Sequence, residues 1–312
     1  MIHFPTSLTE AEAATHGASV RAGATDIAER RHLGIHRGPL VDLRDVPDLS
    51  TILDTPEGGL RIGAMTRIAT LAEDPRVRAR WPGLAQAAAG LATPQIRARA
   101  TVGGNLLQEV RCWYNRSDQF HCLKAGGDQC LARAGDHLFH SCIDLGACAA
   151  PHPSTLAMAF LAFDATAEVA GAPRSLALLL GDGQDPHRTH GLEEGALLSH
   201  LSLPPTLATR SGYVRTTHRS RSEWALVETL VALNVEGDTV KTAQVAIGAV
   251  ANRPLRLPEV EAALVGRNRG ELPMDAFEKV NSRAAPLPMT GYKVPLMAVT
   301  LLDAWTRAWE GA

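Results

Sequence analysis

The chain has 312 residues, a length typical of about two domains. Its 31 basic and 33 acidic side chains give a net charge of −2, which argues against a surface that coats nucleic acid. With 45% hydrophobic and 21% charged residues, the chain can bury a sizeable core. It contains no run of about 18 apolar residues and no secretory signal at its start, so we expect a cytoplasmic protein without membrane insertion.

The first hundred residues alternate short helical and strand-like segments. Residues 8–16 predict a helix, with Thr6 or Ser7 as N-cap and Glu10 close behind. Short strands are expected at residues 18–22, 39–43 and 61–64, and helices at residues 66–73 and 83–91.

The second half begins with an apolar helix at residues 155–165, and residues 181–187 then indicate a surface loop. Strand-forming residues at 211–217, 225–235 and 239–250 predict a sheet with covering helices. We therefore expect an α+β fold, with a first domain at 1–175, linker and edge elements at 176–205, and a second domain at 206–312.

Two glycine turns have the composition of anion-binding loops. The first is Ala22-Gly23-Ala24-Thr25-Asp26, and the second is Thr101-Val102-Gly103-Gly104-Asn105. Glycine lets backbone N–H groups approach a phosphate closely, and Thr and Asn side chains add polar groups. A single turn of this kind is usually only a tight turn, but two could embrace one pyrophosphate. Neither matches GxGxxG or GxxxxGK[ST], which disfavours NAD in a Rossmann pocket and ATP.

These turns and their surroundings resemble the FAD-binding subunit of the molybdenum hydroxylases. That family includes xanthine dehydrogenase, carbon monoxide dehydrogenase, aldehyde oxidoreductases and 4-hydroxybenzoyl-CoA reductase. Its two loops read AGGTD and TxGGN, where this chain has AGATD and TVGGN. Matching stretches include LVDLRDVPDL at 40–49, RIGAMTRIATLAED at 61–74, HPST at 152–155, AIGAVANRPLR at 246–256 and GYKVPL at 291–296.

The resemblance implies a fold and a set of FAD contacts. The fold would be an FAD-binding domain of the vanillyl-alcohol-oxidase/PCMH type, with two α/β subdomains, followed by a smaller α+β domain of the CO dehydrogenase flavoprotein type. The implied FAD-binding residues are Ala22, Gly23, Ala24, Thr25, Asp26, Thr101, Gly103, Gly104, Asn105, Thr155 and Arg215. Ala24 replaces a family glycine and Thr155 a family aspartate, so weaker FAD binding is expected. Arg215 takes the place of a basic residue near the flavin, with a solvated surface arginine as the alternative.

All five cysteines lie in one segment, with the spacing C-x9-C-x7-C-x11-C-x5-C from Cys112 to Cys148. An odd number without an export signal argues against a disulfide framework. The short knuckle of most zinc sites is missing, and the long spacing is compatible with an iron–sulfur cluster. Zinc bound together with His121, His137 or His140 and inert buried thiols are the alternatives.

The resemblance selects four of the five cysteines. Some family members carry a [4Fe–4S] cluster in an insertion after the second glycine loop, here at about residues 108–150. By that pattern the ligands are Cys112, Cys122, Cys130 and Cys148, and Cys142 is a buried or free thiol. A step of about eight residues from Gly104 to Cys112 would place the cluster within roughly 26 Å of the pyrophosphate.

The resemblance further implies an electron-transfer subunit with no catalytic acid–base residues of its own. Its partners would be a large molybdopterin-binding subunit and a small subunit with two [2Fe–2S] clusters, in a trimer or a dimer of trimers. Electrons would pass between these partners and an external acceptor or donor. The alternatives are a degenerate docking subunit without flavin and a stand-alone FAD oxidoreductase. Export together with a signal-bearing partner stays open.

Overall fold

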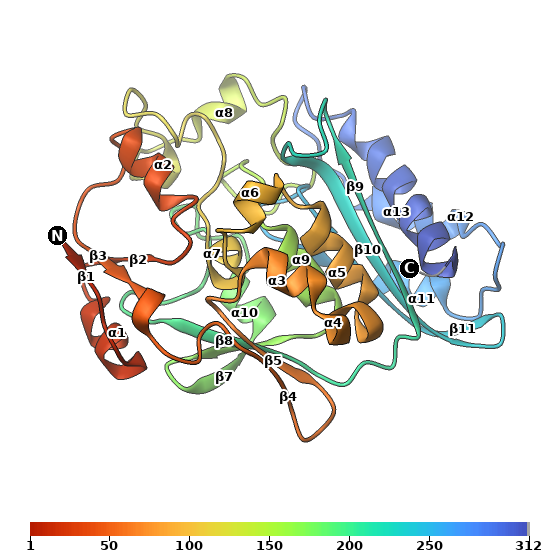
Figure 1. Cartoon of the computed structure of the whole chain (residues 1–312). Coiled ribbons are helices and arrows are strands. Elements are labelled where there is room, and N and C mark those ends of the chain that lie inside the picture. The colour runs from red at the N-terminus through yellow and green to blue at the C-terminus, as the bar shows by residue number, and fades with distance from the viewer. Residues whose placement is uncertain (311–312) are drawn as a thin grey trace.

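Three β-sheets organise residues 1–310, the part of the chain that this computed structural model describes (Figure 1). The first sheet is parallel, in the order β1-β3-β2, and contains β1 (Ile2–His3), β2 (Ser19–Arg21) and β3 (Leu40–Asp42). The second, in the order β4-β5-β8-β6-β7, contains β4 (Ile52–Asp54), β5 (Leu60–Gly63), β6 (Thr166–Val169), β7 (Ala172–Ser175) and β8 (Leu198–Leu203). The third, antiparallel in the order β12-β11-β10-β9, contains β9 (Arg210–Thr217), β10 (Ala225–Glu236), β11 (Thr239–Gly248) and β12 (Leu255–Arg256).

Helices connect and cover these sheets. Those of the first two thirds are α1 (Leu8–Ala14), α2 (Ile27–His32), α3 (Ile68–Glu73), α4 (Pro75–Arg80), α5 (Pro82–Gly90), α6 (Pro94–Arg97), α7 (Val102–Leu106), α8 (Leu131–Ala134), α9 (Thr155–Ala162) and α10 (Leu176–Leu180). The C-terminal helices are α11 (Pro258–Leu264), α12 (Met274–Ser282) and α13 (Lys293–Glu310). No helix within residues 1–310 is long and apolar enough to cross a membrane.

The first helix begins where its sequence predicts. The Ser7 hydroxyl accepts a hydrogen bond from the Glu10 N–H at 3.2 Å, and the Glu10 carboxylate accepts one from the Thr6 N–H at 2.8 Å. This reciprocal pair satisfies two N–H groups that the helix would otherwise leave unbonded. Helix α1 ends at Ala14, two residues earlier than expected.

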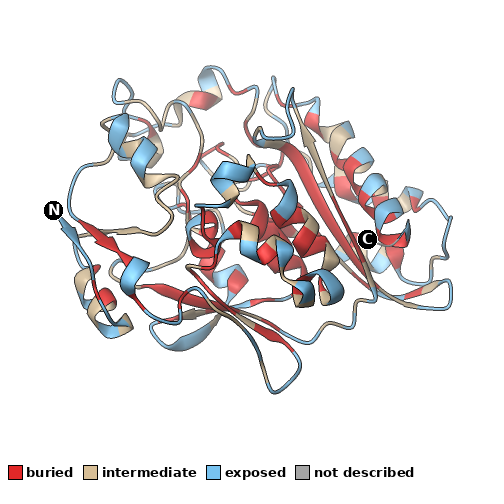
Figure 2. Ribbon diagram, in the orientation of Figure 1, coloured by how far each residue is buried: buried red, intermediate tan, exposed pale blue. Residues whose placement is uncertain are grey.

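Helices cover both faces of the third sheet. Alternate residues of β10 point to opposite faces: Leu230 and Ala232 join the core beneath α5 and α9, while Val231 and Leu233 join the core beneath α13. All eight residues of α9 are buried (Figure 2). One face of the third sheet therefore shares a core with the first part of the chain, and the other face has a separate core with the C-terminal helices.

The segment at 176–205 differs from the expected linker. Strand β8 lies at the centre of the second sheet, where it pairs with β5 and β6. A short apolar run such as residues 197–203 does not distinguish a strand from other buried chain by periodicity alone. The first domain therefore extends through β8 rather than ending near residue 175.

Candidate functional site

The two glycine turns face each other across one cavity of about 270 Å³. The first turn follows β2 and leads into α2, and the second forms the N-terminal end of α7. They lie close together, since a Cβ atom built on Gly104 would be 3.8 Å from the Ala22 Cβ. The structure thus brings together two turns that are about 80 residues apart in the sequence.

Two glycines in these turns have no room for a side chain. A Cβ on Gly23 would collide with the Arg99 carbonyl oxygen, and one on Gly103 would lie 2.8 Å from the Ala64 Cβ. Glycine at these positions lets the backbone pack against neighbouring chain. Both glycines also line the cavity, so their backbone atoms form part of its wall.

Ala24 stands where the family pattern has a glycine, and its backbone adopts the left-handed conformation that glycine tolerates best. Its φ is 64°, a value that costs a non-glycine residue on the order of 1 kcal/mol. The first turn therefore includes a backbone conformation that is unfavourable for alanine.

A second cavity, of about 500 Å³, continues the first. The residues lining both cavities are Thr25, Asp26, Gly104 and Gln108. Asn105, Thr155 and Arg215 line the second cavity. Together the two cavities form a cleft, called the flavin cleft below, and all eleven residues implied by the resemblance lie along it.

Side chains of the second turn hold its shape. The Thr101 hydroxyl accepts a hydrogen bond from the Gly104 N–H at 3.2 Å. The Asn105 side-chain Oδ1 accepts from the Ser154 hydroxyl at 2.8 Å and from the Leu156 N–H at 3.2 Å. Asn105 therefore ties the turn to the start of α9.

Thr155 belongs to a buried polar group shared with the C-terminal domain. Its hydroxyl donates to a carboxylate oxygen of Glu228 at 2.8 Å, and the Tyr213 hydroxyl donates to the same oxygen at 2.9 Å. Glu228 is 2% exposed, and burial raises its pKa above the ordinary value. The carboxyl group that contacts Thr155 therefore comes from β10.

Arg215 is half-buried at the wall of the second cavity. Its guanidinium donates to the carbonyl oxygen of Gly90 at 3.0 Å and to that of Glu223. Its Nε is buried without a hydrogen-bond partner within the described residues. The side chain therefore forms part of the cleft wall.

Ion pairs connect the first turn to the cysteine segment. Asp26 lies 2.6 Å from the Arg116 guanidinium and 3.2 Å from that of Arg111. Asp26 also accepts a hydrogen bond from the Glu109 N–H at 3.1 Å, and Glu29 pairs with both arginines. The two arginines stand on either side of Cys112, so these pairs position the start of the insertion.

Four of the five cysteines line one small enclosure of about 10 Å³, and they are the four implied by the resemblance: Cys112, Cys122, Cys130 and Cys148. A hydrogen bond between two of them lowers the pKa of Cys130 and raises that of Cys148, and burial raises the pKa of Cys112 to about 11. Tyr114, Asn115, Leu123 and Leu131 also line this enclosure.

The fifth cysteine, Cys142, lies elsewhere. It is fully buried in the C-terminal core, with its Sγ 3.9 Å from the Met297 Sδ. Its N–H donates to the Val250 carbonyl and its carbonyl accepts from the Ala285 N–H. Cys142 thus anchors the insertion to the C-terminal domain.

The histidines considered as zinc ligands have other contacts. His137 is engaged at both ring nitrogens by backbone atoms, with the Met289 N–H 3.1 Å from Nε2. His140 Nε2 lies 3.2 Å from the Cys112 Sγ. Within residues 1–310, no three His, Cys, Asp or Glu side chains form a ready site for a single metal ion.

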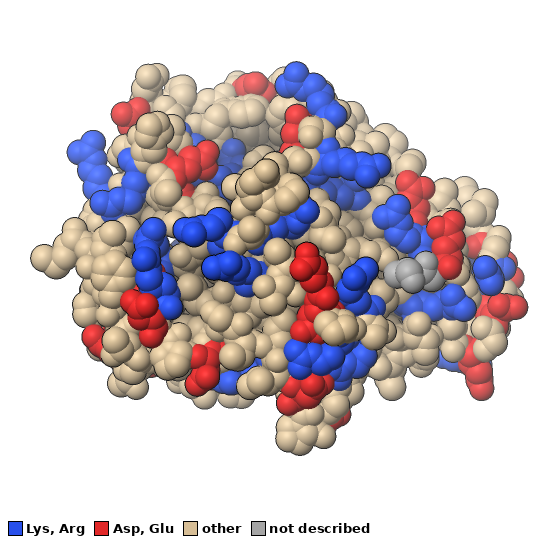
Figure 3. Space-filling model, viewed as in Figure 1, with Lys and Arg blue, Asp and Glu red and all other residues tan. Residues whose placement is uncertain are grey.

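Sequence reasoning missed several residues of the cleft. These are Leu91, Ala92, Ile96, Ala100, Gln108 and Trp224 in the second cavity, and His190 and Leu198 in the first. Three of them, Ala92, Ile96 and Ala100, lie in the stretch ATPQIRARATVGGN at residues 92–105, which ends in the second glycine turn. Lys and Arg side chains gather on the face between α2 and α6, beside the cleft (Figure 3). Such a face favours an anionic ligand.

Two family models match consecutive parts of this chain. Residues 2–206 match the family model of the FAD binding domain in molybdopterin dehydrogenase, and residues 212–308 match that of the CO dehydrogenase flavoprotein C-terminal domain. The aldehyde oxidoreductase FAD-binding subunit PaoB of Escherichia coli K12 is 33% identical over 257 residues, which cover 80% of this chain and 79% of that protein.

Solved structures share the fold along the whole chain. Carbon monoxide dehydrogenase from Hydrogenophaga pseudoflava superposes with a TM-score of 0.76 at 23% identity, covering 100% of this chain and 98% of that one. Quinoline 2-oxidoreductase from Pseudomonas putida 86 superposes with a TM-score of 0.77 at 20% identity, covering 99% and 96%. The chain therefore belongs to the family of FAD-binding subunits of the molybdopterin-dependent dehydrogenases, or molybdenum hydroxylases.

Proposed function

We propose that the chain is the FAD-containing electron-transfer subunit of a molybdenum hydroxylase complex and that it also carries a [4Fe–4S] cluster. The observation that supports this proposal is a cleft lined by the implied FAD residues next to an enclosure lined by four cysteines. The eleven implied FAD residues line one cleft, and four cysteines meet at one enclosure just beyond it.

The cleft suits FAD in shape and chemistry. Backbone N–H groups of the first glycine turn would hold the diphosphate, with Thr25 adding a hydroxyl donor. The N–H groups of the second turn donate within the protein, so that turn would close the other side of the cavity. Thr155 and Arg215, at the far end, would contact the ribityl chain or the ring. FAD would supply the two-electron and one-electron chemistry, and the protein would orient it and set its electrostatics.

The cysteine enclosure offers the donor set of an iron–sulfur cluster. A [4Fe–4S] cluster requires four thiolate ligands, and four cysteines line this enclosure. The fifth cysteine, Cys142, packs in the C-terminal hydrophobic core. Arg111 and Cys112 are neighbours in the chain, and Arg111 also lines the flavin cleft. The two groups would therefore be close enough to exchange single electrons.

Substrate chemistry would take place on partner chains. The relatives are named as subunits or medium chains, and we propose that this chain likewise joins a large molybdopterin-binding subunit and a small subunit with two [2Fe–2S] clusters. Cluster assembly needs reduced thiols, and the cytoplasm keeps thiols reduced, so we propose a cytoplasmic location.

Anaerobic purification of the full chain tests both cofactors. We expect flavin absorption bands near 370 and 450 nm (approximate for flavins in general) and about four iron and four acid-labile sulfide atoms per chain. A colourless chain would support the docking-subunit alternative, and zinc without iron would overturn the cluster. Co-purification from the native host tests the partners, since a lone chain that oxidises an organic substrate would be a stand-alone enzyme.

A further inference from the structure

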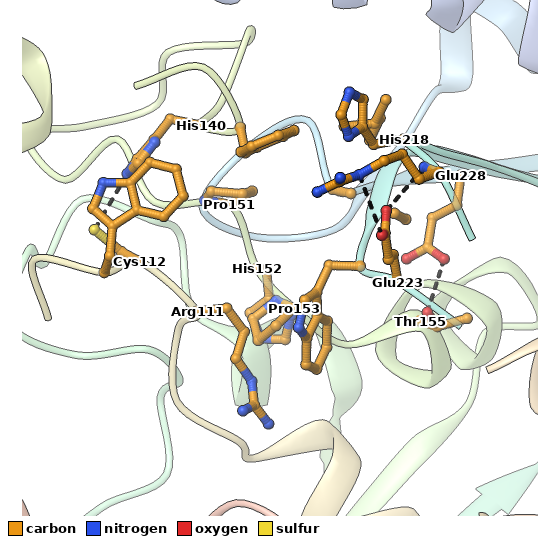
Figure 4. Close-up of a pocket in the computed structure, with 17 residues that line it drawn as sticks. Arg111, Cys112, His140, Pro151, His152, Pro153, Thr155, His218, Glu223 and Glu228 are labelled. Atoms are coloured by element: carbon orange, nitrogen blue, oxygen red, sulfur yellow. Dashed lines mark hydrogen bonds and ion pairs between the residues drawn. The ribbon is translucent and has the colours of Figure 1, made fainter. Parts of the chain in front are cut away.

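A separate chamber of about 330 Å³ lies between the cysteine insertion and the C-terminal sheet (Figure 4). One side is formed by residues of the insertion, including Trp113, Phe139 and His140. The opposite side is formed by the segment that joins β9 to β10, including His218 and Trp224. Two parts of the chain that are distant in sequence thus enclose one mainly aromatic space.

The chamber touches both proposed redox sites. It shares Arg111, Thr155 and Trp224 with the flavin cleft, and Cys112 with the cysteine enclosure. The Arg111 guanidinium lies over the Trp224 ring, 4.4 Å from its centroid, and this pair forms the wall between chamber and cleft. A molecule in the chamber would lie beside both groups.

Its aromatic walls are suited to a flat ring. Trp113 and Phe139 meet edge to face with centroids 6.0 Å apart, and Phe139 and His218 do the same at 5.6 Å. Pro151 and Pro153 add rigid apolar surface. Such walls favour a planar conjugated molecule through stacking and burial of apolar area.

Two buried polar atoms of chamber residues have no partner within the described residues. They are Nδ1 of His140, a residue that is 2% exposed, and Nε2 of His152, a residue that is 1% exposed. The other ring nitrogens are engaged, that of His140 by the Cys112 Sγ and that of His152 by the Ser154 N–H. Unsatisfied buried groups cost free energy, and a ligand oxygen in the chamber would relieve that cost once the ring turned to face it, since both nitrogens are closed off from the free space of the chamber.

We propose that this chamber binds a one- or two-ring quinone, which takes electrons from the flavin. The inference rests on the proposed function of the flavin cleft. The volume fits one or two fused rings, and the chamber walls contain no glycine turn that could hold the phosphates of a dinucleotide.

The electron and proton balance is simple. The quinone takes up two electrons and two protons, its two C=O groups become C–OH groups, and the reduced flavin that supplies them returns to its oxidised form. Quinone oxygens can then alternate between accepting and donating hydrogen bonds, which suits histidines as neighbours.

Filling the chamber tests the site. Ala225, at the start of β10, lines the chamber but not the flavin cleft, so Ala225→Phe occupies the space and Ala225→Leu occupies part of it. Val299→Phe is the matched control, because Val299 is 52% exposed on α13 and lies outside the chamber. The probe is 2-methyl-1,4-naphthoquinone, with binding measured by calorimetry on the purified full chain.

We expect one binding site per chain, a loss of affinity of about tenfold or more in Ala225→Phe, a smaller loss in Ala225→Leu, and none in Val299→Phe. Anaerobic reoxidation of the reduced flavin by the quinone should slow by a similar factor, while reoxidation by ferricyanide, which needs no pocket, should not change. Absence of quinone binding, or a quinone affinity that Ala225→Phe leaves unchanged, would overturn the inference. Flavin absorption in the same samples reports on the proposed function separately, because the calorimetric result does not require FAD.

Discussion

The carboxylate of Asp26 and the guanidinium of Arg116 lie 2.6 Å apart, and this contact joins the first glycine turn to the segment that follows Cys112. The Arg116 side chain is only 8% exposed and also donates to the carbonyl oxygens of Val110 and Glu109. A single acidic residue therefore contributes to the geometry of both proposed cofactor sites.

Replacing Asp26 with Asn should weaken both sites together. The substitution removes the charge that Arg116 and Arg111 share, and a charge-assisted contact of this burial is worth about 2 kcal/mol. We expect a lower free energy of unfolding and reduced contents of both iron and FAD. Asp118→Asn, at an exposed position of the same insertion, is the control and should change none of these. Loss of FAD with full retention of iron would contradict the coupling.

Ala24→Gly should stabilise the protein. Glycine adopts a φ of 64° without strain, although its more flexible unfolded chain offsets part of the gain, which leaves about 0.5–1 kcal/mol. The dissociation constant of FAD should fall, as measured by flavin fluorescence during titration of the FAD-free chain. Ala22→Gly serves as comparison: the φ of Ala22 is not positive, so the same change there should destabilise. Equal effects at the two positions would argue against strain at Ala24.

Cys148→Ala and Cys142→Ala should behave differently. The first removes a thiol from the four-cysteine enclosure and should abolish the cluster, as measured by iron, labile sulfide and electron paramagnetic resonance of the reduced chain. The second should keep the full iron content and lower the free energy of unfolding by about 1–2 kcal/mol, because it leaves a small cavity in the C-terminal core. The reverse pattern would show that the ligand set is wrong.

Glu228→Gln should change how stability depends on pH. Burial raises the pKa of Glu228 above 4.5, so above pH 4.5 the unfolded chain loses this proton more readily than the folded one. Stability contributed at this site is therefore present at low pH and is lost as pH rises toward the folded pKa. Gln keeps an oxygen for Thr155 and Tyr213 but has no proton to lose.

The variant should match the unmodified chain near pH 4.5 and exceed it in stability by a growing margin at higher pH, up to about 1.4 kcal/mol for each pH unit of the window. Urea unfolding at several pH values measures this margin. Glu57→Gln, at an exposed turn, should show no such trend. A constant offset between variant and unmodified chain would mean that Glu228 does not titrate abnormally.

Much of the candidate site could be predicted because its signals are local. Each glycine turn is recognisable from a few neighbouring residues, because small residues follow a strand end or begin a helix. The four cysteines that the resemblance implied line one enclosure in the structure. The three strands and four helices expected before residue 176, and the three long strands expected after 210, also form within a few residues of those positions, while short elements such as β4, α4, α6, β6 and β7 were not expected.

The contacts that could not be predicted join distant parts of the chain. Glu228 meets Thr155 across 73 residues, and Trp224 meets Arg111 across more than a hundred. Glu228 stands in no recognisable motif, and both pairings depend on how β10 packs against α9 and the insertion. The central place of β8 was missed for the same reason, since its partners β5 and β6 come from separate parts of the sequence.

The backbone bonds around Cys142 have a consequence for the order of assembly. The N–H groups of Cys142 and Ile143 donate to the Val250 carbonyl, and that of His152 donates to the Ala251 carbonyl. During synthesis, residues 112–148 leave the ribosome well before residues 250 and 251 exist. The cysteine loop therefore reaches its final framework only after β11 has been made, so a nascent chain exposes thiols that need protection from oxidants or from the wrong metal until translation is nearly complete.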